Sequence, residues 1–296
     1  MSLPTARFGR VITAMVTPFD DSGALDLDAA ANLAAWLVDN GSDGLVLAGT
    51  TGESPVLSDS EEVALAKAVR AAVDVPLLLG TGSNDTNYAV EATRRAAGLG
   101  VDGVLVVSPY YNRPPQSGLD HYFRSVAAAT DLPVLLYDVP TRTGRKVATA
   151  TMLRLAHEVD NIVGLKDAAG NPAETARLMR DAPDDFELYS GDDALTLPLL
   201  AIGAVGAVSV ASHWAGRQIG EMIAAFLRGD HGEAIRINGG LIESYEFAGS
   251  DDAPNPMPSK AILRVLGIKV GNCRAPLSFA PDWLEPRARE VLSALA

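Results

Sequence analysis

Short apolar runs alternate with amphipathic stretches along most of this chain. Eight runs have the length and composition of strands, and most of them are apolar at every position instead of at alternate positions. These candidate strands are Val11–Val16, Gly44–Ala48, Val75–Leu79, Gly103–Val107, Pro133–Tyr137, Ile162–Lys166, Phe186–Tyr189 and Gly206–Val210. Continuous apolar character is typical of strands that are buried on both faces, as in a parallel sheet. The weakest candidate is 186–189, which contains polar residues.

Between these runs, apolar residues recur with the period of a helix. The expected helices are Asp28–Asp39, Ser58–Val73, Asn87–Leu99, Gly118–Ala129, Thr149–Glu158 and Pro172–Arg180. Ser58 and Glu61 form a capping-box pattern, which marks the start of one of these helices. Eight strand–helix units over residues 11 to about 228 predict an α/β fold of the (β/α)8 TIM-barrel type. A doubly wound open sheet is the alternative, but no Gly-x-Gly-x-x-Gly follows the first strand.

The pattern changes after about residue 230, where only helical stretches follow. They are Gly232–Phe247, Ser259–Leu266 and Trp283–Leu295, with a proline-rich turn at 254–258 between the first two. We therefore expect a barrel over residues 1–229 and a C-terminal helical appendage over residues 230–296.

Composition narrows the class of protein. The formal net charge of −13 argues against a general surface for nucleic acid or for anionic membranes, because both need clustered positive charge. The single cysteine, Cys273, allows no internal disulfide, and the first residues lack a signal-peptide pattern, so we expect a cytoplasmic protein. The longest apolar run, Leu195–Val210, is interrupted by Pro198 and is shorter than the roughly 20 residues of a membrane span, so a helix, a turn and a strand are expected there.

Lys166 is unusual because it closes the apolar run 161–166. The chain has four other lysines, for which amphipathic helices or polar connections predict solvation: Lys67, Lys146, Lys260 and Lys269. Burial lowers the pKa of a lysine, and a neutral amine can attack a carbonyl to form a Schiff base. The alternative is a strand-end lysine that reaches solvent or pairs with Asp167.

The segments after the predicted strands carry hydroxyl, phenol and charged groups. In a barrel these segments form one rim, where active sites lie. They are Gly49–Ser54, Ser108–Asn112, Asp138–Gly144 and Ser190–Asp193, beside Tyr137 and Lys166 at two strand ends. The glycine-rich segment is either a tight loop or a set of backbone N–H groups for a carboxylate. Tyrosines there either pack or shuttle protons, and Arg142 is either solvated or binds a substrate carboxylate.

A metal site or a nucleotide site is not indicated by the sequence. The four histidines lack ligand spacing and are most simply surface residues or satisfied core residues: His121, His157, His213 and His231. The Gly-x-x-x-x-Gly-Lys phosphate loop is absent, and Cys273 lies outside the strand-end segments. We expect no bound metal.

Several of these segments together resemble the pyruvate-dependent class I aldolases of the dihydrodipicolinate synthase and N-acetylneuraminate lyase superfamily. The motifs are Gly49–Glu53, Pro109–Asn112, Tyr137–Gly144, Gly164–Asp167, Ser190–Asp193 and the turn Asn255–Lys260. The paired tyrosines and Arg142 resemble the dihydrodipicolinate synthase branch, since the sialic acid lyases lack this arginine. That branch condenses pyruvate with L-aspartate 4-semialdehyde to 4-hydroxy-tetrahydrodipicolinate in lysine and diaminopimelate biosynthesis.

The resemblance implies a role for eight residues. Lys166 would form the Schiff base with pyruvate, so no separate cofactor is needed. The implied proton relay is Tyr137, Thr50 and Tyr111; the implied substrate-binding residues are Thr51, Gly191 and the backbone at Val208, with Arg142 for the carboxylate of aspartate semialdehyde. Asp138 is a departure, because many members have asparagine there.

The resemblance also implies self-association and regulation. Tyr111 would reach into a neighbouring subunit's site in a dimer or a tetramer. The positions of the family's lysine-inhibition site are occupied here by Ser54, Asp59, Glu62, Asn84, Tyr88 and Tyr110, and we expect weak or absent feedback. Two alternatives stay open: a related aldolase or dehydratase acting on a sugar-derived 2-keto acid, such as an N-acetylneuraminate lyase, and a non-catalytic 2-keto acid sensor.

Overall fold

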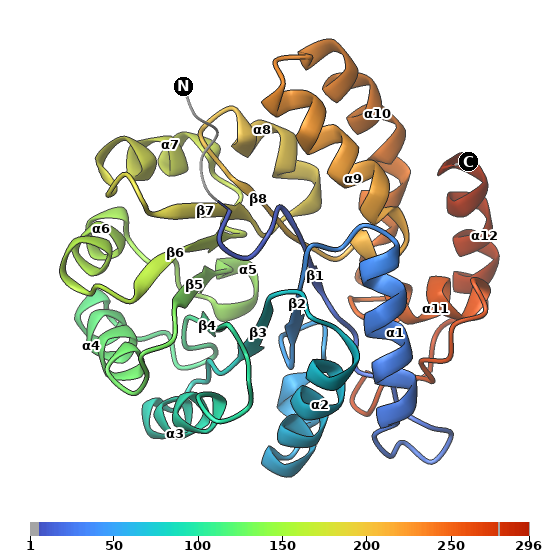
Figure 1. Cartoon of the computed structure of the whole chain (residues 1–296), viewed down its shortest axis with the longest axis horizontal. Helices are drawn as coiled ribbons and strands as arrows, with labels where there is room; N and C mark the ends of the chain where they lie inside the picture. The colour runs from blue at the N-terminus through green and yellow to red at the C-terminus, as the bar shows by residue number, and fades with distance from the viewer. Residues whose placement is uncertain (1–5, 278, 296) are drawn as a thin grey trace.

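Eight parallel strands close into a barrel in chain order (Figure 1). The computed structural model describes residues 6–277 and 279–295. The strands are β1 Val11–Ala14, β2 Gly44–Leu47, β3 Leu77–Gly80, β4 Gly103–Val107, β5 Val134–Asp138, β6 Ile162–Asp167, β7 Glu187–Ser190 and β8 Gly206–Ser209. The predicted (β/α)8 barrel is confirmed, and nearly every strand position is buried, as the continuous apolar runs require.

Helices surround the barrel as an outer ring. They are α1 Leu27–Asp39, α2 Asp59–Ala72, α3 Thr86–Ala96, α4 Gln116–Ala127, α6 Thr149–Glu158, α7 Pro172–Asp181, α8 Thr196–Leu200 and α9 Ser212–Leu227. The capping box of Ser58 and Glu61 is present at the start of α2. Short helices lie in the loops after three strands: η1 Ser54–Val56, α5 Pro140–Thr143 and η2 Asp193–Leu195. The run 195–210 forms α8, a turn and β8, as expected.

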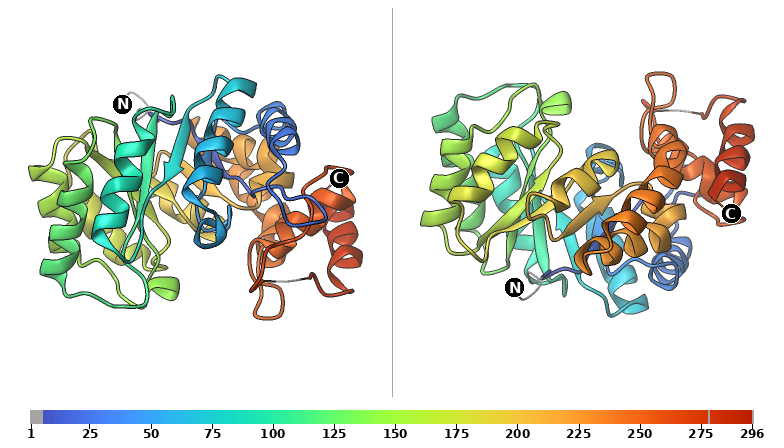
Figure 2. Two further views of the ribbon diagram at one scale, coloured as in Figure 1. Left: turned by 90° about the horizontal axis from the view of Figure 1, so that it is seen from below. Right: turned by 90° about the horizontal axis from the view of Figure 1, so that it is seen from above.

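Three further helices complete the chain: α10 His231–Phe247, α11 Met257–Val265 and α12 Leu284–Leu295. Figures 1 and 2 show α10 against α9, with α11 and α12 beside α1 at the end of the molecule away from α4 and α6. One hydrophobic cluster contains Ile219 of α9, Leu241 of α10, Ile262 of α11 and Leu284 of α12. The predicted helical appendage is present. Its apolar side chains belong to the same hydrophobic cluster that lies between the strands and the surrounding helices. The boundary at 229/230 stays a prediction.

A second hydrophobic cluster fills the inside of the barrel and includes Ile12, Leu78 and Val208. The polar residues of β7 belong to this interior. The Tyr189 hydroxyl donates to Glu187 Oε2 at 3.0 Å, and Glu187 Oε1 accepts from the backbone N–H of Arg7 at 2.9 Å. The weak strand candidate is therefore a true strand, whose polar side chains bond to one another and to the chain before β1.

Within residues 6–277 and 279–295, no helix combines the length and the apolar character needed to cross a membrane.

Candidate active site

Lys166 and Tyr137 meet at the C-terminal ends of neighbouring strands. They are paired in the register of β5 and β6, and Lys166 Nζ lies 4.1 Å from the centroid of the Tyr137 ring. Lys166 is 5% exposed, and desolvation lowers its pKa to about 8, although the negative charge of Asp193 opposes this shift. The alternative of a solvated lysine is therefore wrong for this chain.

Asp167 does not serve as the partner of Lys166. Its Oδ2 accepts a hydrogen bond of 2.5 Å from the Thr175 hydroxyl, and its Oδ1 accepts from the backbone N–H of Ala169 at 2.8 Å. Because these bonds occupy both oxygens of the carboxylate on the outer side of the barrel, the Lys166 amine stays available for chemistry at the barrel mouth.

Gly191 makes room for the Lys166 side chain. A Cβ atom at position 191 would lie 2.9 Å from Lys166 Cγ and 3.0 Å from Cε. Real Cβ atoms essentially never approach this closely, so any other residue would displace the lysine chain. The structure thus places Gly191 beside the Lys166 side chain, and its role in substrate binding stays a prediction.

Thr50 and Thr51 belong to a tight loop after β2. The N–H of Glu53 donates to the Thr50 carbonyl at 3.1 Å, and the N–H of Ser54 donates to the Gly49 carbonyl at 3.2 Å. Thr50 and Tyr137 line the same two cavities. Burial raises the pKa of Tyr137 to about 12, against the opposing effects of Arg142 and of the Thr50 side chain.

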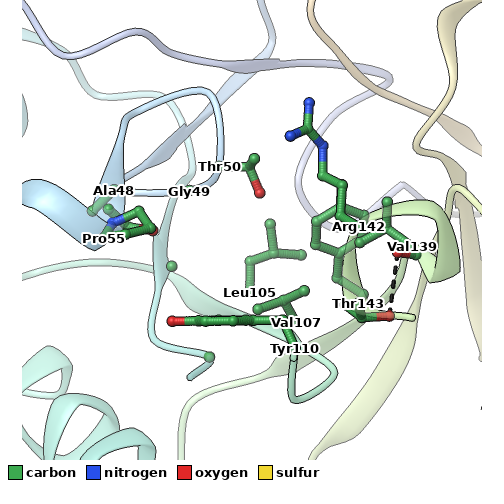
Figure 3. A pocket seen from close by; sticks show the side chains of 14 residues that line it. Ala48, Gly49, Thr50, Pro55, Leu105, Val107, Tyr110, Val139, Arg142 and Thr143 are labelled. Atoms are coloured by element: carbon green, nitrogen blue, oxygen red, sulfur yellow. Dashed lines mark hydrogen bonds between the residues drawn. The ribbon is translucent and has the colours of Figure 1, made fainter. Parts of the chain in front are cut away.

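A cavity of about 660 Å³ opens above Lys166. Six of the predicted residues line it, namely Thr50, Thr51, Tyr137, Arg142, Lys166 and Gly191. Tyr245 and Asn255 of the C-terminal region line it as well. A neighbouring cavity of about 200 Å³ shares Thr50 and Arg142, and Figure 3 shows these side chains facing its interior, with the Tyr110 ring along one side. The rim therefore combines an amine, a phenol, two hydroxyls and a guanidinium.

Two predicted residues lie outside this group. Tyr111 is 90% exposed, has a left-handed φ of 73° and lines neither cavity. Val208 is buried in the barrel interior, while Val210 of the same segment reaches the larger cavity. Within one chain the structure therefore does not bring Tyr111 to Tyr137.

Four of the six predicted regulatory residues line a third cavity of about 420 Å³, beside α2 and α3. It is lined by Ser54, Glu62, Tyr88 and Tyr110, and Ser54 and Tyr110 also line the 200 Å³ cavity. Burial raises the pKa of Glu62 to about 7. The backbone carbonyl of Asn84 accepts a hydrogen bond from Asn112 Nδ2 at 2.8 Å.

Asp59 connects the two helices at this cavity. Its Oδ1 accepts from the Tyr88 hydroxyl at 2.8 Å and pairs with the Arg95 guanidinium at 2.8 Å. Tyr88 and Asp59 thus bond to each other instead of presenting free groups to the third cavity.

Asp193 lies in the strand-end segment 190–193, but the sequence alone indicates no role for it. Asp193 Oδ2 accepts from the backbone N–H groups of Val210 at 3.0 Å and Ala211 at 2.8 Å. Its carboxylate faces the lysine closely enough to favour the charged form of Lys166. An acidic residue after a strand on the same rim was the available signal.

The expected solvation of Lys260 is wrong. Lys260 is 0% exposed, and its Nζ lies 2.7 Å from Oε1 of the equally buried Glu53. All residues of α11 from 257 to 263 are buried, because the helix packs between the barrel and α12. The sequence of a single short helix could not show how many neighbours would cover it.

Lys146 is also more than a solvated lysine. It is 35% exposed at its side chain and lies 3.2 Å from Oδ2 of Asp138, which is buried. Asp138 Oδ1 accepts from the backbone N–H of Val147 at 3.3 Å. The aspartate that departs from the family's usual asparagine therefore points outward from the barrel, to a basic partner and away from the cavity.

Among residues 6–277 and 279–295, no group of three or more His, Cys, Asp or Glu side chains is arranged so that it could hold a metal ion. His213 is a satisfied core residue, as one of the two expectations had it: its Nε2 accepts from the N–H of Val16 at 3.1 Å, and its Nδ1 lies 2.8 Å from the Val210 carbonyl. Burial lowers its pKa to about 4, so the ring is neutral near pH 7.

Comparison with known proteins agrees with this geometry. Residues 7–294 match the model of the dihydrodipicolinate synthetase family. A 4-hydroxy-tetrahydrodipicolinate synthase from Synechococcus sp. (strain CC9605) is 50% identical over 299 residues, which cover 99% of this chain and 97% of that protein.

Two solved structures have the same fold at high identity. A dihydrodipicolinate synthase from Cyanidioschyzon merolae with lysine bound is 47% identical, with a TM-score of 0.94 over 98% of this chain and 99% of that one. A dihydrodipicolinate synthase from Bacillus anthracis is 42% identical, with a TM-score of 0.93 over 98% of this chain and 99% of that one.

Proposed function

Because the chain belongs to the dihydrodipicolinate synthetase family, we propose that it condenses pyruvate with L-aspartate 4-semialdehyde to give 4-hydroxy-tetrahydrodipicolinate. This reaction serves lysine and diaminopimelate biosynthesis, and relatives that are about half identical to the chain carry the name of that activity. The observation that carries the proposal is the buried Lys166 amine beneath a cavity that Arg142 also lines. The sugar-derived 2-keto acid reaction and the sensor are not favoured.

The chemistry begins at Lys166. Its neutral amine attacks the keto carbon of pyruvate, and the resulting carbinolamine loses water to form a Schiff base. Loss of a methyl proton from this adduct gives an enamine, because the protonated imine accepts the electron pair. The enamine carbon then forms a bond to the aldehyde carbon of the second substrate, and the substrate's own amine closes the ring as it displaces Lys166.

Proton transfer in these steps needs a hydroxyl next to the amine. Tyr137 lies against Lys166 Nζ, and Thr50 lines the same cavity as both, which supports a role for Tyr137 and Thr50 as a relay. The proposed third member, Tyr111, is exposed and would act in a second copy of the chain, as the family resemblance implies. Thr51 and the backbone at Val208 would hold the pyruvate carboxylate.

Arg142 gives the site a preference for an anionic aldehyde. It stands on α5, directly after β5, and faces the cavity that Thr50 lines (Figure 3). Its planar guanidinium can donate two parallel hydrogen bonds to a carboxylate such as that of aspartate semialdehyde. A neutral sugar aldehyde offers no such group.

Three further properties belong to the proposal. The covalent bond to Lys166 makes a separate organic cofactor or metal unnecessary. The chain acts in the cytoplasm, and it works as a dimer or as a tetramer built from two dimers.

An aldehyde panel tests the function. Purified protein is given pyruvate with aspartate semialdehyde, N-acetylmannosamine or a neutral short aldehyde, and product is followed for each. We expect turnover with aspartate semialdehyde to exceed that with the others. Faster reaction with N-acetylmannosamine would assign a lyase, and binding of pyruvate without turnover of any aldehyde would assign the sensor.

A further inference from the structure

The loop that carries Thr50 and Thr51 is attached to the C-terminal region at two points. Asn255 Nδ2 donates to Thr51 Oγ1 at 2.9 Å, and Lys260 Nζ pairs with Glu53 Oε1 at 2.7 Å. Asn255 and Lys260 flank the first turn of α11. A short segment more than 190 residues away in sequence thus contacts both the hydroxyl and the end of the loop that follows β2.

Both side chains of the Glu53–Lys260 ion pair are buried, and the contact between Lys260 Nζ and Glu53 Oε1 is ionic, without a hydrogen bond to Oε1 among the described residues. The side chains of Lys260 and Glu53 are 0% and 1% exposed. Lys260 Nζ also donates to the Asn272 carbonyl at 2.9 Å and lies 4.3 Å from the centroid of the Phe19 ring. Glu53 Oε2 accepts from the backbone N–H of Arg274 at 2.8 Å.

Such a pair is a costly way to stabilise a fold. Removing two charges from water opposes folding, and apolar residues of similar volume often replace a buried pair with little change in stability. What the pair provides here is orientation of the Glu53 carboxylate, because one oxygen contacts Lys260 Nζ while the other accepts from the Arg274 N–H.

Glu53 needs that support because of its backbone. Its φ of 59° and ψ of 35° place it in the left-handed region, where a residue with a Cβ is strained. The strained residue closes the turn in which its own N–H binds the Thr50 carbonyl. Fixing the Glu53 side chain therefore fixes the conformation that presents Thr50 to Tyr137.

The Asn255 contact determines how Thr51 can bond. The Thr51 oxygen accepts from the amide, so its hydrogen is left to donate elsewhere, and the side chains of both residues reach the 660 Å³ cavity. The Ser259 hydroxyl donates to Asn255 Oδ1 at 3.5 Å, which is consistent with this orientation of the amide. Thr51 is thereby prepared as a donor to an anionic group of a bound substrate.

We propose that Asn255 and Lys260 are positioning residues for the reaction, which hold Thr51 and Thr50 in the geometry that binds pyruvate and relays its protons. This inference rests on the proposed function, because it assigns their effect to pyruvate. It makes the C-terminal region a working part of the active site, although neither residue needs to touch a reacting atom.

The test distinguishes an effect of these residues on the geometry of the active site from an effect on the stability of the fold. Lys260→Met alone leaves Glu53 charged and buried, so it can unfold the protein and is not decisive. The decisive variant is the double change Glu53→Gln with Lys260→Met, which removes both charges and keeps an acceptor for the Arg274 N–H. Asn255→Ala tests the second contact, and Asn255→Ser, which can still donate, tests rescue. Lys269→Met is the matched control, since Lys269 lies shortly after α11, is exposed, and forms its ion pair with Asp26, which does not belong to the loop of Thr50 and Thr51.

Each variant is compared with the wild type by thermal unfolding, by borohydride trapping at increasing pyruvate concentration, and by steady-state rates. For the double variant we expect a melting temperature near the wild-type value, a kcat lowered about ten- to a hundredfold, and a raised KM for pyruvate. The KM for aspartate semialdehyde should change little, because Arg142 stands on a separate loop. Asn255→Ala should raise the KM for pyruvate, and Asn255→Ser should partly restore it.

A double variant with the wild-type melting temperature and wild-type kinetics would show that the ion pair is structural only and would overturn the proposal. An equal rise of KM for both substrates would overturn it too. Failure of the proposed function looks different: the wild type would then trap pyruvate, or fail to, without turning over aspartate semialdehyde. If the wild type traps pyruvate without turning over aspartate semialdehyde, the trapping titration still tests whether Asn255 and Lys260 position Thr51.

Discussion

Lys166 and Tyr137 stand next to each other in the parallel register of β6 and β5, with Nζ 4.1 Å from the centre of the phenol ring. Strand pairing sets this relationship, and no flexible loop is involved. The Lys166 amine and the Tyr137 ring, which carries the hydroxyl proposed to move protons, therefore have fixed relative positions before any substrate binds.

The first prediction concerns the covalent adduct. Borohydride reduction in the presence of pyruvate should attach one pyruvate per chain, and peptide mass spectrometry should locate it on Lys166. Lys166→Ala should lose nearly all turnover, because no other amine lies beneath Tyr137 in the described structure. Lys67→Ala, on the outer helix α2, is the control and should keep its activity. An adduct on another lysine would defeat the assignment.

The second prediction concerns pH. Desolvation lowers the pKa of Lys166 to about 8, so the reactive neutral form increases as pH rises through that value. The initial rate of adduct formation should rise between about pH 7 and 9 and then level off. Asp193→Asn removes a negative charge that favours the ammonium form and should move the midpoint to lower pH. A midpoint near 10.5, the ordinary value for lysine, would contradict the effect of burial.

The third prediction concerns Arg142. Arg142→Ala should raise the KM for aspartate semialdehyde by an amount equivalent to about 2–3 kcal/mol, because a charge-assisted bond to the substrate carboxylate is lost. The KM for pyruvate should stay near the wild-type value. Arg180→Ala removes an exposed arginine of α7 and is the matched control. Equal losses for both substrates would exclude the proposed role.

The fourth prediction concerns assembly. Tyr111 is 90% exposed and its backbone is in the left-handed region, an arrangement that suits a side chain reaching into another subunit. Sedimentation at assay concentration should show a dimer or a tetramer. Tyr111→Phe should lower kcat without dissociating the subunits, since only the hydroxyl is removed. A fully active monomer would rule out a shared site.

The fifth prediction concerns feedback by lysine. The family resemblance implies that Tyr88 stands where lysine-inhibited members have a glutamate. In the structure the Tyr88 hydroxyl donates to Asp59, which also pairs with Arg95. Loss of one charged partner costs roughly 1.5–3 kcal/mol, about ten- to a hundredfold in affinity. A lysine titration at low pyruvate should show half-inhibition only above millimolar concentration, and Tyr88→Glu should lower that value. Inhibition of the wild type below millimolar lysine would show that Glu62 or Asp59 compensates.

The sequence by itself determined the barrel and most of the rim. Parallel strands buried on both faces are apolar at every position, so their number and order could be read along the chain. The loops that follow such strands must meet at one end of a barrel, so the sequence alone predicts that Thr50, Arg142 and Lys166 lie on one rim. A lysine at the end of an apolar run also stands out in the sequence, because the apolar residues before it offer its charge no partner.

Only the tertiary structure decided which side chains those loops depend on. Lys260 and Asn255 look like ordinary polar residues of a turn and a short helix, and their partners Glu53 and Thr51 lie about two hundred positions away in the chain. Alternation along β5 already directs Asp138 to the opposite face from Tyr137, but only the tertiary structure shows that Lys146 is its partner there. The burial of a charge and the direction of a hydroxyl depend on contacts between distant segments, and no local pattern of apolar and polar residues records them.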